Sequence, residues 1–172
     1  MHSVLLKKAQ KDDDEAYVTL LATYEADLYR FIYTQCGNVE DTLDVVQEVA
    51  YRSFKYIHTV KEPAFFKTWL FRIAINASND LFKKRTKFEL LDDTYSEDSF
   101  QQLFDLKFTL QAVMTYLTPI EKQVVYLKYY EELTFQQISD ILQVKLGTVK
   151  SILYRALSKL KQALHVEGYN VI

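Results

Sequence analysis

The chain has few of the residues that build tight turns, disulfides or metal sites. Its 172 residues include one cysteine, three glycines and two prolines. The single cysteine, Cys36, excludes an internal disulfide and a cysteine-rich zinc site, and it is typical of a reducing compartment. Sheet proteins and open α/β folds need many tight turns, so the scarcity of glycine and proline predicts long helices with few connections.

Two further absences bound the class of protein. No apolar run approaches the roughly 20 residues of a membrane span, and the N-terminus lacks the basic-then-apolar layout of a signal peptide. Hydrophobic residues make up 49% of the chain and charged residues 26%, a mixture typical of globular proteins. We therefore expect an all-α cytoplasmic protein, long enough for one ordinary domain or two small ones.

Charge is arranged in blocks, although the formal net charge is only −2. Residues 67–88 contain six basic residues and one acid, and residues 141–166 contain five basic residues and no acid. Residues 89–105 contain six acids and no base, and residues 38–51 contain four acids and no base. This alternation predicts two surfaces that face a polyanion and at least one surface for a different partner.

Apolar periodicity predicts the helices and the domains. The expected helices span about 14–35, 40–57, 64–86 and 100–116, then one from 118, a short one over 134–142 and a last one over 148–164. The acidic stretch between the two groups has no clean apolar period, which favours a flexible linker. The predicted organisation is a first domain over 1–88, a linker over 89–105 and a second domain over 106–172.

The second domain contains two helix starts with the spacing of a capping box. They are Thr118 with Glu121, and Thr134 with Gln137. The second start opens the short helix, which a tight turn joins to the basic last helix. This order is a helix-turn-helix layout.

The last predicted helix has an apolar face and a basic face. The apolar face holds Val149, Ile152, Leu153, Ala156, Leu157, Leu160 and Leu164. The opposite face offers cations for phosphates and hydrogen-bonding groups for base edges. A solvated basic face is the alternative. The absence of any acid, together with the short capped helix before it, favours DNA.

The other two amphipathic helices have polar faces of opposite sign. The helix over 64–86 carries Asn76 and Asn79 among its bases, and asparagine both donates and accepts at base edges. Considered alone, this face fits nucleic acid and plain solvation equally. The helix over 40–57 places Asp41, Asp44 and Glu48 on one face. Acids near a helix N-terminus are stabilised by the helix dipole, so these residues alone indicate capping chemistry.

Nothing in the sequence supports catalysis. The acidic runs at 12–15 and 92–93 lie in a terminus and in the linker, where carboxylates are normally solvated. The three histidines are scattered, and the isolated glycines cannot form a phosphate loop. We expect no catalytic residue, no metal site and no cofactor.

Three segments, in order along nearly the whole chain, resemble the extracytoplasmic-function (ECF, group 4) sigma factors of the sigma-70 family. Residues 41–54, DTLDVVQEVAYRSF, resemble region 2.2, and residues 66–76, FKTWLFRIAIN, resemble regions 2.3 and 2.4. Residues 118–164 resemble region 4, and the family also has a linker where this chain has its acidic stretch. The resemblance implies an all-α sigma factor that binds core RNA polymerase and directs promoter-specific transcription initiation.

The resemblance also implies site residues and partners. Docking on the β′ clamp helices of polymerase is implied for Asp41, Leu43, Asp44, Gln47 and Glu48. Recognition of the −10 element, with the loop 58–66, is implied for Arg72, Asn76, Asn79, Lys83, Lys84 and Lys87. Recognition of the −35 element is implied for Thr148, Lys150, Ser151, Tyr154, Arg155 and Lys159. The implied partners are core polymerase (β′ clamp helices and β flap), promoter DNA and a dedicated anti-sigma factor.

Three positions depart from the family pattern. Ile152 stands where many relatives have arginine, which implies one missing DNA contact and an altered −35 preference. Gln143 stands where the turn often has glycine, and a left-handed glutamine costs roughly 1–2 kcal/mol. Ser139 replaces the usual alanine in the first helix of the motif.

Two other classes of protein remain as alternatives. An ordinary helix-turn-helix regulator would have a similar second domain, but it needs neither the acidic helix nor the asparagine-lysine face of residues 41–88. A helical adaptor that binds only protein would show no salt-dependent affinity for DNA.

Overall fold

The computed structural model describes residues 2–89 and 114–166, and its regular elements in this part of the chain are all helices. This confirms the prediction of an all-α fold. The chain divides into two compact units, Met1–Ser99 and Phe100–Ile172. The predicted linker over 89–105, except its first residue, and most of the helix expected over 100–116 lie outside the described residues. The exact domain boundaries therefore stay a prediction.

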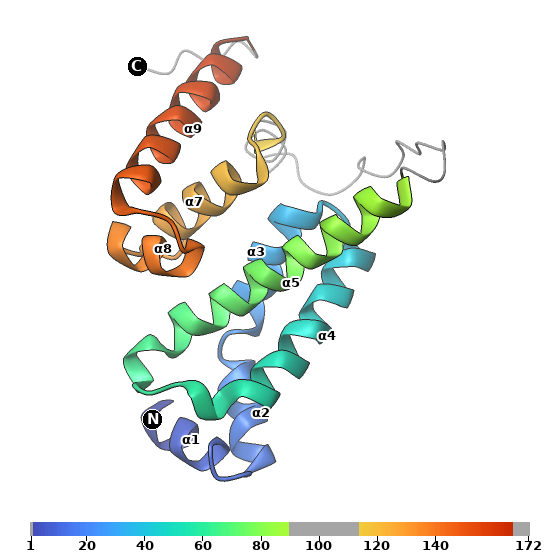
Figure 1. The fold of residues 1–172 in the computed structure, drawn as a ribbon, viewed down its shortest axis with the longest axis vertical. Coiled ribbons are helices and arrows are strands. Elements are labelled where there is room, and N and C mark those ends of the chain that lie inside the picture. Colours follow the sequence, from blue (N-terminus) through green and yellow to red (C-terminus); the bar gives the residue numbers. More distant parts are fainter. Residues whose placement is uncertain (1, 90–113, 167–172) are drawn as a thin grey trace. The chain divides into compact units, whose positions relative to one another are not determined.

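The described residues of the first unit form five α-helices and two short 3-10 turns (Figure 1). They are α1 (His2–Ala9), α2 (Asp14–Ala22), α3 (Glu25–Cys36), α4 (Val39–Tyr56), η1 (Ile57–Thr59), η2 (Pro63–Phe65) and α5 (Phe66–Glu89). Helices α4 and α5 lie side by side and antiparallel, and α3 packs against both. Their shared core includes Phe31 and Phe71, which are fully buried and meet edge to face at 5.3 Å between ring centroids.

The predicted helix over 14–35 is wrong in one respect, because two helices occupy this stretch. The break lies at Thr23 and Tyr24, which leave the helical hydrogen-bond pattern. The Thr23 hydroxyl donates to the Leu20 carbonyl at 2.7 Å, and such local bonds compete with the helix. The centroid of the Tyr24 ring lies 5.6 Å from that of the His2 ring and 5.4 Å from that of the Phe66 ring. The break thus coincides with a local hydrogen bond of Thr23 and with packing of Tyr24 against residues distant in sequence, and periodicity does not detect this packing.

The loop between α3 and α4 follows the sequence prediction. Gly37 ends α3 in the left-handed conformation, with φ 78°, and donates its N–H to the Tyr33 carbonyl at 2.9 Å. The Asn38 side chain then caps α4 by accepting from the Asp41 N–H at 2.9 Å. Local residue chemistry is therefore sufficient to separate these two helices.

The second unit contains α7 (Pro119–Tyr129), α8 (Phe135–Leu142) and α9 (Leu146–Val166). Both predicted capping boxes are confirmed, Thr118 with Glu121 and Thr134 with Gln137. Helix α9 packs against α7 and α8, and its predicted apolar face is buried or half-buried throughout. The short α8, a tight turn and the long basic α9 give the expected helix-turn-helix.

Candidate nucleic-acid and protein interfaces

The acidic face of α4 is smaller than the sequence predicts. Leu43, Asp44 and Gln47 are exposed, and Glu48 is half-buried. Asp41 instead is 3% exposed, and its carboxylate pairs with Arg85 of α5 while accepting from the Asn38 amide. Because Asp41 points toward α5, it ties the two helices together and does not contribute to the exposed surface. The carboxylate of Asp41 is therefore not part of the exposed acidic face of α4, and the assignment of Asp41 to polymerase docking stays a prediction.

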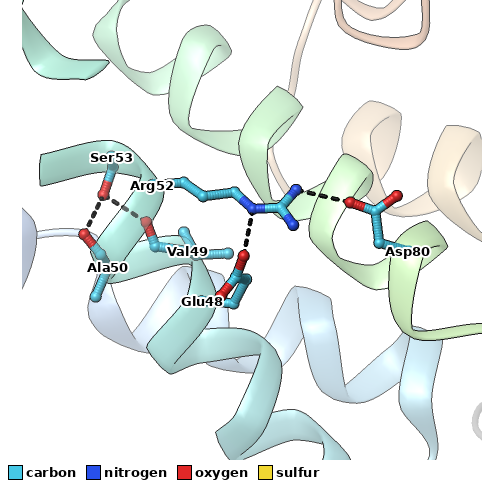
Figure 2. A network of polar contacts seen from close by, with 6 residues as sticks. All are labelled: Glu48, Val49, Ala50, Arg52, Ser53 and Asp80. Atoms are coloured by element: carbon cyan, nitrogen blue, oxygen red, sulfur yellow. Dashed lines mark hydrogen bonds and ion pairs between the residues drawn. The ribbon is translucent and has the colours of Figure 1, made fainter. Parts of the chain in front are cut away.

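Arg52 links the acidic face of α4 to α5 (Figure 2). Its Nε lies 2.6 Å from Glu48 Oε1, and its Nη1 lies 2.8 Å from Asp80 Oδ2. Burial alone would lower the pKa of the guanidinium, but the hydrogen bonds to Asp80 and Glu48 outweigh it and raise that pKa. The docking candidate Glu48 thus shares Arg52 with Asp80 of α5, the helix that carries the −10 candidates.

The polar face predicted for α5 exists on the described part of that helix. Arg72, Asn76, Lys83 and Lys84 are exposed, and Asn79 is half-buried. The side chain of the remaining candidate, Lys87, lies outside the described residues. The face combines amides that can donate and accept with cations that can hold phosphates. It therefore has the chemistry that recognition of DNA bases and backbone requires.

The connection between α4 and α5 presents most of its side chains to solvent. Ile57 and Val60 are each 5% exposed and anchor it, whereas Phe65 is 59% exposed. Gln10, which the sequence did not single out, donates from Nε2 to the carbonyls of Ile57 at 3.1 Å and Val60 at 2.7 Å. No local pattern marks Gln10, because its partners are 47 and 50 residues away.

The exposed face of α9 carries most of the −35 candidates. Thr148, Lys150, Ser151, Tyr154 and Arg155 are all exposed, and Tyr154 is 67% exposed. The ammonium group of Lys150 also lies 5.7 Å from the ring centroid of Phe135 in α8. These residues form one continuous polar and cationic surface that a DNA groove can contact.

A buried carboxylate lies beneath that surface. Glu121 is 1% exposed, and its oxygens accept from Arg155 Nε at 3.1 Å, Lys159 Nζ at 2.8 Å and the Thr118 N–H at 2.9 Å. Burial opposes ionisation, but the bonds from Lys159 and Thr118 outweigh it and lower the pKa of Glu121 to about 2. The side chain of Arg155 remains 60% exposed, against 37% for Lys159. Both −35 candidates therefore share one internal counterion.

The three departures from the family pattern have structural explanations. Ile152 is 4% exposed and packs in the core of its unit, and its effect on −35 preference stays a prediction. Gln143 adopts the left-handed conformation with φ 57° and ψ 39°. Ser139 is 8% exposed and donates to the Val144 carbonyl at 2.6 Å, which ties the end of α8 to the turn.

Among the described residues there is no group of three or more His, Cys, Asp or Glu side chains that could hold a metal ion. Burial and the nearby Asp41 carboxylate raise the pKa of the Cys36 thiol to about 11, so this thiol is protonated at neutral pH. No helix in the described part of the chain is long and apolar enough to cross a membrane.

Comparison with known proteins places both units in one family. Residues 20–88 match the family model Sigma-70 region 2, and residues 113–162 match the family model Sigma-70, region 4. The RNA polymerase sigma factor SigV of Bacillus subtilis is 30% identical over 87% of this chain and 92% of its own length. The ECF RNA polymerase sigma factor SigW of the same organism is 29% identical over 92% of this chain and 94% of its own length.

Solved structures show a similar fold. CnrH, in a complex with the cytosolic domain of CnrY, matches with a TM-score of 0.74 and 20% identity over 96% of this chain and 97% of that chain. The sigma factor RpoE of Bartonella quintana, in a complex with the anti-sigma factor NepR, matches with a TM-score of 0.77 and 19% identity. That match covers 87% of this chain and 97% of that chain.

Proposed function

The chain belongs to the sigma-70 family as an extracytoplasmic-function RNA polymerase sigma factor, and on that premise we propose how its residues divide the work of transcription initiation. Region 2 lies in the first unit and region 4 in the second. The proposed domain limits are 1–88 and 106–172, with residues 89–105 as the linker between them.

In this proposal the polymerase docks on the exposed face of α4. Leu43 provides apolar contact, Asp44 provides charge, and Gln47 and Glu48 provide hydrogen-bonding groups for the β′ clamp helices. Asp41, which is buried and paired with Arg85, supports this face from beneath. The exposed acid in this set is Asp44, so we expect its charge to be decisive.

The −10 element is received as single-stranded DNA by α5 and the loop before it. Asn76 and Asn79 face the base edges, while Arg72, Lys83 and Lys84 hold the backbone. Lys87 completes the set by its register on α5. A base flipped out of the duplex loses a few kcal/mol of stacking and pairing, so its pocket must supply compensating contacts.

The −35 element is read as duplex DNA by α9. Lys150, Ser151, Tyr154 and Arg155 reach the major groove, and Thr148 lies at the start of the same face. Lys159, whose ammonium group donates to Glu121, supports this surface. The other proposed partners are the β flap and an anti-sigma factor. We also propose a cytoplasmic protein with no catalysis and no cofactor of its own.

One observation carries the proposal: segments that match sigma-70 regions 2 and 4 occur in this order in a single chain. A helix-turn-helix regulator accounts for the second segment alone. The first segment supplies an exposed carboxylate on α4 and an asparagine-lysine face on α5, and a regulator has no use for this pair. The regulator is therefore not favoured.

Run-off transcription on fragmented genomic DNA, with the purified chain and core polymerase, tests the proposal. We expect new discrete start sites with the wild type, and their loss with Asp44→Arg because the reversed charge repels the docking partner. Glu15→Arg, which reverses an exposed acid on α2, is the matched control and keeps the starts. Undiminished starts with Asp44→Arg would contradict the docking assignment. Duplex binding without polymerase, and no starts at all, would identify a regulator.

A further inference from the structure

The loop that joins α4 to α5 is held by a side chain from the N-terminal segment. Gln10 follows directly after α1, and its amide donates to the carbonyls of Ile57 and Val60. Helix α1 is itself anchored by Leu6 and Ala9, which are 2% and 4% exposed. In Figure 1, α1 lies beside the turn between α4 and α5, in agreement with the contacts between α1 and η2.

The two bonds fall at the positions where this loop is anchored. Ile57 and Val60 are its buried residues, while His58, Thr59, Lys61, Glu62, Ala64 and Phe65 are exposed. The loop contains the backbone bonds Val60 N–H to Ile57 carbonyl, at 3.2 Å, and Phe65 N–H to Glu62 carbonyl, at 3.0 Å. Each of these closes only a single turn. Gln10 connects the loop to a separate packed helix and so fixes its path.

A loop that receives a nucleotide gains from such fixation. Ordering the backbone of a loop on binding costs conformational entropy, so a loop that is ordered beforehand binds more tightly. The exposed residues from His58 to Phe65 form one side of the proposed −10 surface. A bond that holds the backbone beneath them acts on the bound strand without touching it.

We infer that Gln10 is a positioning residue for −10 recognition: its amide holds the Ile57 and Val60 carbonyls, so that the loop over 57–65 is preformed to receive a single-stranded base. The inference rests on the proposed function, because it assumes that this loop contacts the −10 strand. It adds the N-terminal segment to the parts of the chain that determine promoter opening.

Two variants separate the hydrogen bonds from packing. Gln10→Ala removes the amide, whereas Gln10→Glu keeps the shape but replaces the donors with a carboxylate that repels the two carbonyls. Ser3→Ala, at an exposed position of α1, is the control. Each protein is assembled with core polymerase. The affinity of each holoenzyme is measured for a fork template with a single-stranded −10 non-template strand, and separately for duplex −35 DNA. The affinity of each free variant for the core enzyme is measured as well.

We expect both Gln10 variants to bind the fork about tenfold more weakly, as the loss of two ordinary hydrogen bonds predicts. Affinity for −35 duplex and for core should be unchanged, and Ser3→Ala should match wild type throughout. In hydrogen exchange of the free chain, the amides of residues 57–65 should exchange faster while those of α4 and α5 keep their protection.

Three results would overturn the inference. Fork binding equal to wild type would show that the bonds do not matter for the −10 strand. Loss of core affinity, or loss of protection across α4 and α5, would give Gln10 a general folding role instead. If wild-type holoenzyme itself has no preference for the single-stranded −10 strand, then the proposed function fails. That outcome is distinct, because it appears before any variant is compared.

Discussion

The carboxylate of Glu121 should contribute a measurable and pH-dependent share of the stability of the second unit. Its pKa is lowered to about 2 from an ordinary value of 4.5. At about 1.4 kcal/mol per pKa unit, this shift corresponds to about 3 kcal/mol of folding free energy. The two cations remain partly in water, at 60% and 37% exposure, and solvent screening reduces the figure to about 2 kcal/mol.

The sign of the pH dependence follows from the direction of the shift. The pKa of Glu121 is lower in the folded chain, so the stabilisation is fully present above the unfolded value of 4.5 and is lost as the pH falls toward 2. Glu121→Gln should therefore lower the free energy of unfolding by about 2 kcal/mol at pH 7, and the difference from wild type should shrink by more than half at pH 3.

Urea unfolding can be followed separately in each unit. The single tryptophan, Trp69, belongs to the first unit, so its fluorescence reports that unit, whereas circular dichroism reports the helices of both. With Glu121→Gln we expect an earlier dichroism transition and an unchanged Trp69 transition, and Glu132→Gln, at an exposed glutamate, should behave as wild type. Equal stability at pH 7, or a difference that persists unchanged at pH 3, would refute the reasoning.

Two further predictions concern the same unit. Gln143→Gly should stabilise the second unit by about 1 kcal/mol in urea unfolding, because glycine adopts the left-handed conformation without the strain of a side chain. A loss of stability would mean that the hydrogen bond from the Gln143 amide to the Asp140 carbonyl outweighs the strain. For holoenzyme binding to −35 duplex, Lys150→Ala should lower the slope of log affinity against log salt concentration by the amount expected for about one phosphate contact. Lys159→Ala should change this slope little, because Glu121 already neutralises the ammonium group of Lys159. Equal reductions in the two variants would contradict this difference.

Features set by neighbouring residues could be predicted from the sequence. Both capping boxes, the break at Gly37 and Asn38, and the buried face of α9 depend on chemistry or periodicity within a few residues, and all are observed. The family resemblance similarly rested on contiguous motifs, and the matching family models confirm it.

Features set by distant contacts could not be predicted. Asp41 has the periodicity of an exposed acid, yet Arg85, 44 residues later, draws it into the interior. The sequence identifies Glu121 as part of a capping box, but its bonds to Arg155 and Lys159 cross 34 and 38 residues. The packing of Tyr24 at the break between α2 and α3 and the bonds of Gln10 likewise join segments that are distant in sequence. The periodicity of a helix indicates the face on which a side chain lies, but not which residue it meets on that face.

Two ion pairs between described residues of α4 and α5 also specify how these antiparallel helices are aligned. Arg52 meets Asp80 and Asp41 meets Arg85. Sliding α5 by one turn in one direction would bring Lys84 opposite Arg52 and an acid, Glu89, opposite Asp41, so like charges would face each other at both ends. Sliding it the other way would offer only Asn76 and Leu81. Apolar side chains tolerate several alignments, whereas these two ion pairs form in one alignment only. That alignment fixes the register between α4, which carries the proposed polymerase-docking residues, and α5, which carries the proposed −10 residues.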